Sequence, residues 1–333
     1  MDYRFLLSDP RTQAEFLDRF DDLADEFARV GGLEGLEGGP GLGSPSDAVK
    51  SITEGVGPPP DPGMEAIILR FTRPVQLVQR STFRPPADEF PQAQEIIDRL
   101  EDGRVPLEAA IPSSGRIDLR NHRMAWVGTG WVVGPRLVVT NRHVAEEFAR
   151  PENGGWVFRE PIPGRRVRAT LDWRQEYQID AESRFRVDEV LWIEPEPGPD
   201  MALLRIAETG EDGEPVPEPI GLLTEAELDE LGAGGWIGVI GYPARDSRNS
   251  AEDQQRIFDG VYNVKRLAPG QITGISTDVV SHDATTLGGN SGSALIDMRT
   301  GKAAALHFGG IQEIRNSAVP APAVARIIRD RIG

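Results

Sequence analysis

The sequence predicts a mainly β protein with a small number of helices, and three observations support this prediction. Glycine (37 residues) and proline (27 residues) are abundant in a chain of 333 residues. From about residue 116 onward, short apolar runs are separated by Gly, Pro and Asp, as in barrels and sandwiches. Stretches with long helical periodicity are few. A chain of this length can bury a large core and is expected to form about two compact units.

Residues 1–62 are expected to form an acidic helix followed by a linker. Asp9 can cap the helix and Pro10 suits its first position, within residues 9–30. An apolar stripe follows at spacings of four and three: Phe16, Phe20, Leu23, Phe27 and Val30. The stripe is expected to pack within the chain, and docking onto a regulatory partner protein is the alternative. Residues 31–63 are rich in Gly, Pro and Ser, as flexible linkers are. Thirteen acidic and five basic residues give residues 1–62 a net −8 of the total −17.

Residues 63–115 are expected to lead into the main domain through strands and a short helix. Residues 65–71 and 75–83 have the composition of two strands. Residues 91–101 fit an amphipathic helix that buries Ala93, Ile96, Ile97 and Leu100.

Residues 116–333 form the third predicted region and contain most of the strands. Residues 125–140 read as a hairpin that turns at Gly134-Pro135. Residues 236–242 and 303–308 are further apolar strands. A last amphipathic helix over residues 321–332 is expected to bury Val324, Ile327, Ile328 and Ile332.

Charge and cysteine content exclude several classes of function. With a net charge of −17 and a pI near 4.8, the chain has no basic surface for nucleic acid or an anionic membrane. It has no cysteine, so disulfides, thiol catalysis and thiolate metal sites are excluded. No leader-like or bilayer-spanning apolar segment is evident, which favours a cytoplasmic location.

The segment Gly288-Gly289-Asn290-Ser291-Gly292-Ser293 is typical of a serine presented on a tight turn. Glycine permits backbone angles that other residues avoid, and the turn leaves amide groups free to face an oxyanion. Glycine-rich turns with serine are also common in ordinary loops, so this segment alone is only suggestive.

Two other segments supply the remaining groups that a serine nucleophile needs. His143 follows the apolar strand 137–139, and Asp200 precedes the apolar run 201–204. A histidine can accept the serine proton, and a carboxylate can hold the histidine's far nitrogen. Taken singly, His143 could be a structural histidine and Asp200 a turn or capping residue. The rival carboxylates Asp180 and Asp188 lie in more polar surroundings.

Five segments in this order resemble the chymotrypsin-type serine peptidases, especially bacterial members without disulfides of the glutamyl-endopeptidase kind. They are Gly128-Thr129-Gly130-Trp131-Val132-Val133, Thr140-Asn141-Arg142-His143-Val144, Asp200-Met201-Ala202-Leu203-Leu204, Gly241-Tyr242-Pro243 and Gly289-Asn290-Ser291-Gly292-Ser293. The resemblance covers residues 116–333 and implies two six-stranded antiparallel β-barrels followed by a C-terminal helix. It also implies that His143 is the general base, Asp200 its orienting group and Ser291 the nucleophile. The amides of Gly289 and Ser291 would form the oxyanion hole, and no metal or organic cofactor is expected.

The same resemblance points to residues that select the substrate. Trypsin-like enzymes that cleave after Lys or Arg carry an aspartate where this chain has Thr285, although Asp283 lies nearby. Glutamyl endopeptidases bind the substrate carboxylate through a threonine and a histidine, and Thr286 and His307 stand at matching places. Gly309 follows on the same strand as His307 and is included among the substrate-binding candidates. A hydroxyl and an imidazole can both donate hydrogen bonds to a carboxylate, which predicts Glu or Asp at P1. The alternative for His307 is a core histidine in a strand.

Asn290 departs from the pattern of relatives that are activated by cleavage. Those relatives carry aspartate at this position and pair it with a newly formed N-terminus, whereas asparagine cannot form that ion pair. Regulation by the N-terminal region or by a partner is therefore expected instead.

The expected function is a serine endopeptidase that acts on protein or peptide substrates. The alternatives are a protease-like module that binds peptides without turnover, and a latent protease released by a signal.

Overall fold

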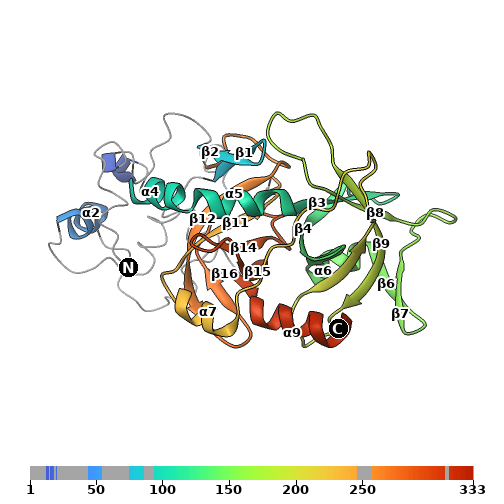
Figure 1. Ribbon diagram of the computed structural model, residues 1–333. Coiled ribbons are helices and arrows are strands. Elements are labelled where there is room, and N and C mark those ends of the chain that lie inside the picture. The colour runs from blue at the N-terminus through green and yellow to red at the C-terminus, as the bar shows by residue number, and fades with distance from the viewer. Residues whose placement is uncertain are drawn as a thin grey trace.

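The computed structural model describes residues 13–14, 16–18, 20, 44–54, 75–85, 94–245, 257–311 and 315–332. Within them, two closed six-stranded antiparallel barrels lie side by side (Figure 1). The prediction of a mainly β protein with a double barrel and a C-terminal helix is confirmed.

The first barrel surrounds its own apolar core. Its strands follow one another around the ring in the order β10-β5-β4-β3-β8-β9. Their bounds are β3 (Ser114–Arg120), β4 (Trp126–Gly134), β5 (Leu137–Thr140), β8 (Arg168–Asp172), β9 (Arg184–Ile193) and β10 (Ala202–Ile206). The predicted hairpin over residues 125–140 is β4–β5. A small hairpin outside the ring consists of β6 (Ala149–Glu152) and β7 (Gly155–Phe158).

The second barrel closes through the pairing of β11 with β12. The ring order is β11-β14-β15-β16-β13-β12. Its strands are β11 (Trp236–Gly241), β12 (Arg266–Ile275), β13 (Val280–His282), β14 (Ala294–Asp297), β15 (Ala303–Ile311) and β16 (Arg315–Pro320). The predicted strands 236–242 and 303–308 correspond to β11 and to the larger part of β15. Helix α7 (Glu225–Leu231) precedes this barrel and begins with a capping box between Thr224 and Glu227.

Strand β5 shows why the sequence has continuous apolar runs instead of simple alternation. Val138 lies in the interior cluster of the first barrel. Its neighbour Val139 points the other way and joins a cluster that includes Ile240 and Leu306 of the second barrel. Because successive side chains point to opposite faces, both faces of β5 are buried. The apolar contact between the barrels therefore uses the outer faces of the same strands.

The expected strand 75–83 is instead a hairpin of β1 (Gln76–Gln79) and β2 (Thr82–Arg84). Arg80 and Ser81 both have positive φ angles, 54° and 59°, as a two-residue turn of this kind requires. The sequence lacks the glycine or asparagine that usually marks such a turn, so the break could not be predicted. Strand β1 continues the sheet of the second barrel by pairing with β12.

Helices cover the outside of the second barrel. Helix α4 (Gln94–Asp102) matches the predicted helix 91–101, with Ile96 and Leu100 buried and Ile97 half-buried. Helix α5 (Arg104–Ala110) follows it and was not predicted. Helix α2 (Pro45–Glu54) lies within the region expected to be linker.

The predicted helix 9–30 and strand 65–71 fall largely outside the described residues. Those described between 13 and 20 are helical, and Phe16 and Phe20 are buried in the cluster that also contains Ile96 and Leu100. Leu23, Phe27, Val30 and Ala93 lie outside the description.

Helix α9 (Ala321–Ile332) ends the described chain and passes from the second barrel toward the first (Figure 1). Val324 and Ile327 are buried and Ile328 is partly buried, as predicted. The prediction for Ile332 is wrong, because this residue is 39% exposed in the last turn. Arg331 is the residue there that reaches the first barrel, with its guanidinium 4.0 Å from the centre of the Trp192 ring.

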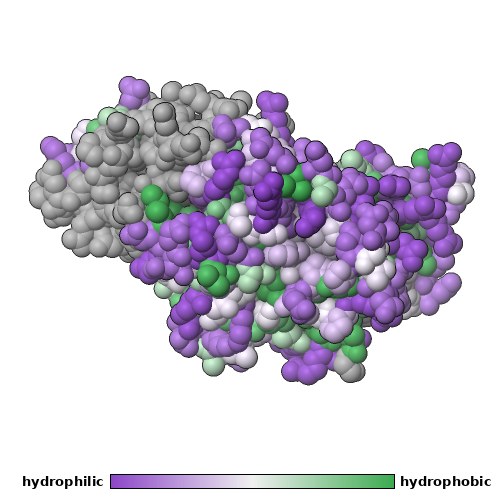
Figure 2. Space-filling view, turned by 45° about the horizontal axis from the view of Figure 1, so that its top comes forward, coloured by the Kyte–Doolittle hydropathy of each residue, from purple (hydrophilic) through white to green (hydrophobic). Residues whose placement is uncertain are grey.

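The surface in Figure 2 is mainly hydrophilic, with hydrophobic residues in small separate groups. None of the helices in the described ranges is long and apolar enough to cross a membrane.

Candidate active site

His143 and Asp200 form a close pair at one end of the first barrel. Helix α6 (Arg142–Phe148) begins directly after β5, so its second residue, His143, stands at the barrel edge. Its Nδ1 lies 2.6 Å from Oδ2 of Asp200, and its backbone N–H donates to Oδ1 over 3.1 Å. The Asp200 side chain is largely buried, whereas that of His143 is half-exposed. One carboxylate thus holds both the ring and the backbone of the histidine.

The two residues before His143 hold the loop that carries Asp200. Asn141 Nδ2 donates to the carbonyl of Asp200 over 2.9 Å. The Arg142 guanidinium donates to the carbonyls of Glu194 and Gly198 at 3.0 and 3.1 Å. Sequence reasoning missed both roles, although the two residues lie within the motif that contains His143.

The rival aspartates lie elsewhere. Asp188 pairs with Arg136 and Arg186 on the outside of the first barrel. Asp180 is exposed. Asp200 is the aspartate in contact with His143.

The Ser291 loop joins β13 to β14 in the second barrel and is bonded to the first barrel through Thr129 of β4. The Thr129 backbone N–H donates to the carbonyl of Ser291 over 2.9 Å. The Thr129 hydroxyl donates to the carbonyl of Gly289 over 3.0 Å. On its own barrel, Gly292 N–H donates to the carbonyl of His307 over 2.8 Å. The loop is therefore fixed from both barrels, and Thr129 is a residue that sequence reasoning missed.

Two positions of this loop require glycine. Gly289 and Gly292 have φ angles of +89° and +87°, which L side chains rarely adopt. A Cβ at Gly289 would overlap the Trp126 ring and the carbonyl of Tyr242, and one at Gly292 would overlap the carbonyl of Thr129. The glycines flanking Ser291 serve both backbone conformation and close contact between the barrels.

Gly128 brings the Ser291 loop close to the His143 helix. A Cβ placed on Gly128 would lie 2.9 Å from the carbonyl oxygen of Ser291 and 2.9 Å from Cγ2 of Val144. The Ser291 carbonyl and the side chain of Val144, the residue next to His143, therefore both lie close to Gly128.

The amides of the loop divide into bonded and free groups. Those of Asn290, Gly292 and Ser293 donate to the carbonyls of Leu287, His307 and Asn290. Across the described ranges, no hydrogen bond uses the amides of Gly289 and Ser291. These two N–H groups are available to bind an oxygen.

Asn290 is buried in a tight space near the second-barrel segment Gly241-Tyr242-Pro243. It is 5% exposed. A Cβ on Gly241 would lie 2.5 Å from Oδ1 of Asn290 and would overlap the hydroxyl of Ser293. Burial of an uncharged amide here avoids the cost of burying an unpaired carboxylate.

The candidate specificity residues belong to two hydrogen-bonded pairs of side chains in the second barrel. Thr286 Oγ1 lies 2.9 Å from Oδ1 of Asn316, and Nδ2 of Asn316 donates to the carbonyl of Ala284 over 2.7 Å. The rings of His282 and His307 meet edge to face, with His282 Nε2 3.1 Å from His307 Nδ1. His282 and Asn316 are cross-strand partners. Sequence reasoning identified Thr286 and His307 but missed His282 and Asn316, which lie on other strands.

His282 and His307 are both neutral near pH 7. Burial, followed by the nearby His143, lowers the pKa of His307 to about 3. Burial and the neighbouring His307 lower the pKa of His282 well below its usual value. A protonated His307, which would have strengthened binding of a carboxylate, is therefore not present under neutral conditions.

The remaining candidates make fewer contacts. Thr285 is half-buried. Gly309 has a φ of +132° and open space where a Cβ would stand. Asp283 accepts a hydrogen bond from the backbone N–H of Gln271 over 2.7 Å. In the part of the chain that the structure describes, no cluster of three or more His, Asp or Glu side chains could hold a metal ion.

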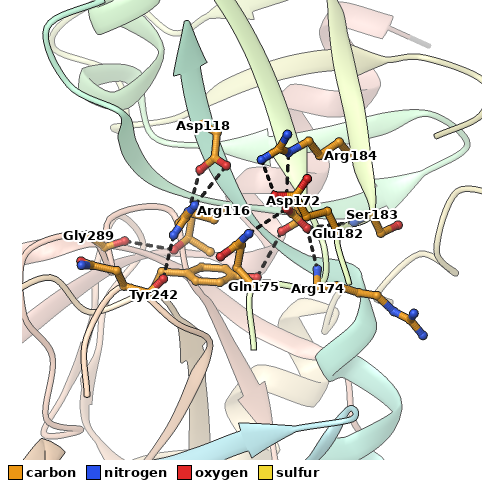
Figure 3. A network of polar contacts seen from close by, with 12 residues as sticks. Arg116, Asp118, Asp172, Arg174, Gln175, Glu182, Ser183, Arg184, Tyr242 and Gly289 are labelled. Carbon is orange, nitrogen blue, oxygen red and sulfur yellow. Dashed lines mark hydrogen bonds and ion pairs between the residues drawn. The ribbon is translucent and has the colours of Figure 1, made fainter. Parts of the chain in front are cut away.

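A polar network fixes the barrels to each other beside the site (Figure 3). The buried Tyr242 hydroxyl lies 3.3 Å from the carbonyls of Ser114 and Asp172 in the first barrel. The carboxylate of Asp172 is fully buried and accepts from the amides of Arg174 and Ser183 and from the side chain of Gln175. Burial, together with the charge of Asp172, raises the pKa of Tyr242 well above its usual value.

Comparisons with known proteins identify the family of this chain. The family model described as a trypsin-like peptidase domain matches residues 128–306, which is more than half of the chain. The chain therefore belongs to the trypsin-like peptidase family. A relative from Lysobacter enzymogenes, named as probable serine protease FE772_23060, is 34% identical over 247 residues. That alignment covers 65% of this chain and 61% of the relative, so the chain spans less than two thirds of that protein.

Among solved structures, the inactive form of Rv3671c protease is 20% identical, with a TM-score of 0.42 over 70% of this chain and 96% of the other. A second inactive form of Rv3671c, from M. tuberculosis H37Rv, is also 20% identical. Its TM-score is 0.41, and the match covers 68% of this chain and 89% of the other.

Proposed function

We propose that this protein is a serine endopeptidase that hydrolyses peptide bonds through an acyl-enzyme. In this proposal His143 is the general base, Asp200 orients it and Ser291 is the nucleophile. The observation that carries the proposal is the double contact of Asp200 with the Nδ1 and the backbone N–H of His143. Membership of the trypsin-like peptidase family supports the same class of reaction.

The first step is attack by Ser291 on the substrate carbonyl. A serine hydroxyl is almost wholly protonated near pH 7, so it needs a base that takes its proton as the new bond forms. The Nδ1 of His143 is bound to Asp200, which leaves Nε2 free to accept that proton. Asp200 stabilises the imidazolium that results.

The developing oxyanion requires hydrogen-bond donors. The unbonded amides of Gly289 and Ser291 are the groups that we assign to this role. His143 then gives the proton taken from Ser291 to the leaving amine as the C–N bond breaks, which leaves the acyl-enzyme. In the second half of the reaction water attacks the acyl carbon while His143 takes a proton from it. His143 passes that proton to the Ser291 oxygen as the acyl–oxygen bond breaks, which releases the acid product and restores Ser291.

We propose that Thr286 and His307 line the pocket for the P1 side chain. His307 lies next to the loop of the nucleophile. Its carbonyl accepts from the Gly292 N–H, and its own N–H donates to the carbonyl of Ser293. The pocket then suits a polar P1 side chain with an acceptor oxygen. The expected Glu and Asp belong to that class, as do Gln and Asn.

We also propose that the N-terminal extension regulates activity from the side of the second barrel. The fully buried Arg266 donates to the carbonyls of Val75 and Gln76 at 2.6 and 3.0 Å. It donates as well to the carbonyls of Phe258 and Val261. A change in the position of β1 would therefore reach β12 directly. Docking of a partner on this extension is the corresponding proposal for external control.

A fluorophosphonate probe tests the proposed chemistry. The intact chain should be labelled at Ser291, and Ser291→Ala and His143→Ala should abolish labelling and peptide cleavage. If neither labelling nor cleavage occurs with folded protein, the peptide-binding module without turnover replaces this proposal.

A further inference from the structure

Two hydrogen-bonded pairs, Thr286–Asn316 and His282–His307, determine which atoms the proposed P1 pocket offers to a substrate. Two of these residues, Thr286 and His307, stand at positions that face the substrate in the proposed function, on which this inference rests. The other two, Asn316 and His282, lie behind them and fix their protons.

Asn316 fixes the proton of Thr286. The carbonyl of Ala284 can only accept, so the group of Asn316 that faces it over 2.7 Å is the NH₂ of Nδ2. The carboxamide oxygen Oδ1 then faces Thr286 Oγ1 at 2.9 Å. An amide oxygen also only accepts, so the single proton of Thr286 points to Asn316. Thr286 therefore offers lone pairs to the pocket and no proton.

His282 fixes the proton of His307. The contact between His282 Nε2 and His307 Nδ1 needs one proton, carried by either ring. His282 Nδ1 is buried and has no partner among the described residues. Because a buried N–H without an acceptor is less tolerable than a bare lone pair, the His282 proton lies on Nε2. It is donated to His307 Nδ1, and the His307 proton therefore lies on Nε2.

His307 Nε2 is the free nitrogen of the His282–His307 pair. It has no hydrogen-bond partner in the described part of the chain and, unlike His282 Nδ1, it is not completely shielded from solvent. The pocket thus combines one donor, His307 Nε2–H, with one acceptor, Thr286 Oγ1. No Lys or Arg in the described ranges forms an ion pair or hydrogen bond with any of the four residues.

We infer that the P1 pocket selects a neutral carboxamide, glutamine first, over the carboxylate of glutamate. The amide oxygen of glutamine accepts from His307 Nε2–H, and its NH₂ donates to Thr286 Oγ1. Glutamate has the same shape but offers no proton to Thr286, and its charge meets no cation among the described residues. Burial of both rings supports this reading, since the low pKa of His307, about 3, prevents the pair from taking up a balancing proton.

Matched peptides that differ only at P1 test the inference. At pH 7.5 we expect kcat/KM for a Gln peptide to exceed that for the Glu peptide by at least about tenfold, the effect of one unpaired polar contact. The ratio should fall as the pH approaches about 4.3, where the glutamate carboxyl gains a proton and resembles the amide. Equal or faster cleavage of the Glu peptide at pH 7.5 overturns the inference and leaves the proposed protease standing.

Thr286 variants separate hydrogen bonding from pocket shape. Thr286→Val keeps the shape but removes the acceptor, and should bring the Gln-to-Glu ratio close to one. Thr286→Ser keeps the hydroxyl and should retain most of the preference. An unchanged ratio in Thr286→Val contradicts the inference. Labelling of Ser291 without cleavage of any Gln peptide contradicts it too. Absence of both labelling and cleavage removes the proposed function, and the inference fails with it.

Discussion

The backbone N–H of Thr129 donates to the carbonyl of Ser291 over 2.9 Å, and this bond joins the first barrel to the loop of the proposed nucleophile. The hydroxyl of the same threonine reaches the carbonyl of Gly289. Its own carbonyl accepts from Thr140 Oγ1 over 2.7 Å, which ties it to the strand that leads to His143. Thr129 thus connects both halves of the site.

Thr129→Val should lower kcat by about tenfold or more with little change in KM. The substitution keeps the branched shape but removes the donor to Gly289, and small displacements of catalytic groups have large effects on rate. Thr129→Ser keeps the hydroxyl and should stay close to the parent. Steady-state kinetics and the rate of fluorophosphonate labelling measure the effect. Equal kcat values for the valine variant and the parent would show that the Gly289 bond has no positioning role.

Asp200→Asn should reduce kcat by about 10⁴-fold while leaving the fold intact, because an amide favours the wrong tautomer of the paired histidine. Asp188→Asn is the matched control, since Asp188 lies on the same barrel and, within the described residues, pairs with arginines at the surface. It should change the free energy of unfolding by about 1 kcal/mol or less and leave kcat unchanged. Similar losses of kcat in the two variants would refute the assignment of Asp200.

Gly292→Ala should destabilise the protein and prevent labelling of Ser291. Its φ of +87° strains any L residue, and its Cβ would overlap the Thr129 carbonyl. Gly213 has the same φ of +87° with nothing within 4 Å of its Cβ, so Gly213→Ala isolates the strain alone. We expect about 1–2 kcal/mol for Gly213→Ala and at least about 3 kcal/mol for Gly292→Ala. Thermal unfolding measures both, and equal losses would mean that contact between the barrels adds nothing.

Lys265 should make stability depend on pH in the alkaline range. Its side chain is fully buried, and its Nζ donates to the carbonyls of Ile111 and Trp173. Burial lowers its pKa from 10.5 to about 8, only partly opposed by Glu176. Between these values the unfolded chain binds a proton that the folded chain lacks, so the contribution of Lys265 to stability rises with pH by at most about 1.4 kcal/mol per unit.

The comparison with Lys265→Met isolates this contribution. The free energy of unfolding of the parent minus that of the variant should increase between pH 8 and pH 10.5. Denaturant unfolding at several pH values measures it. A difference that is independent of pH would show that Lys265 titrates equally in the folded and unfolded states.

Local pattern was sufficient to predict most individual elements. Hydrophobic periodicity predicted the elements that bury one face against a core. These are the 125–140 hairpin, strands 236–242 and 303–308, and the final helix. The β1–β2 turn was not predictable, since Arg80 and Ser81 carry no local signal for positive φ. The exposure of Ile332 was not predictable either, because helical spacing does not show at which turn the surface covered by α9 ends.

The sequence by itself determined the class of the protein and the motifs in which His143, Asp200 and Ser291 occur, because each motif is a short run with its own backbone requirement. Only the tertiary structure decided how those runs are held. Thr129, Asn141 and Arg142 bind carbonyl groups far away in the chain. In the same way, His282 and Asn316 contact His307 and Thr286 from neighbouring strands. A side chain's residue type predicts that it can form a hydrogen bond, but the position of its proton depends on partners that only the folded barrels bring together.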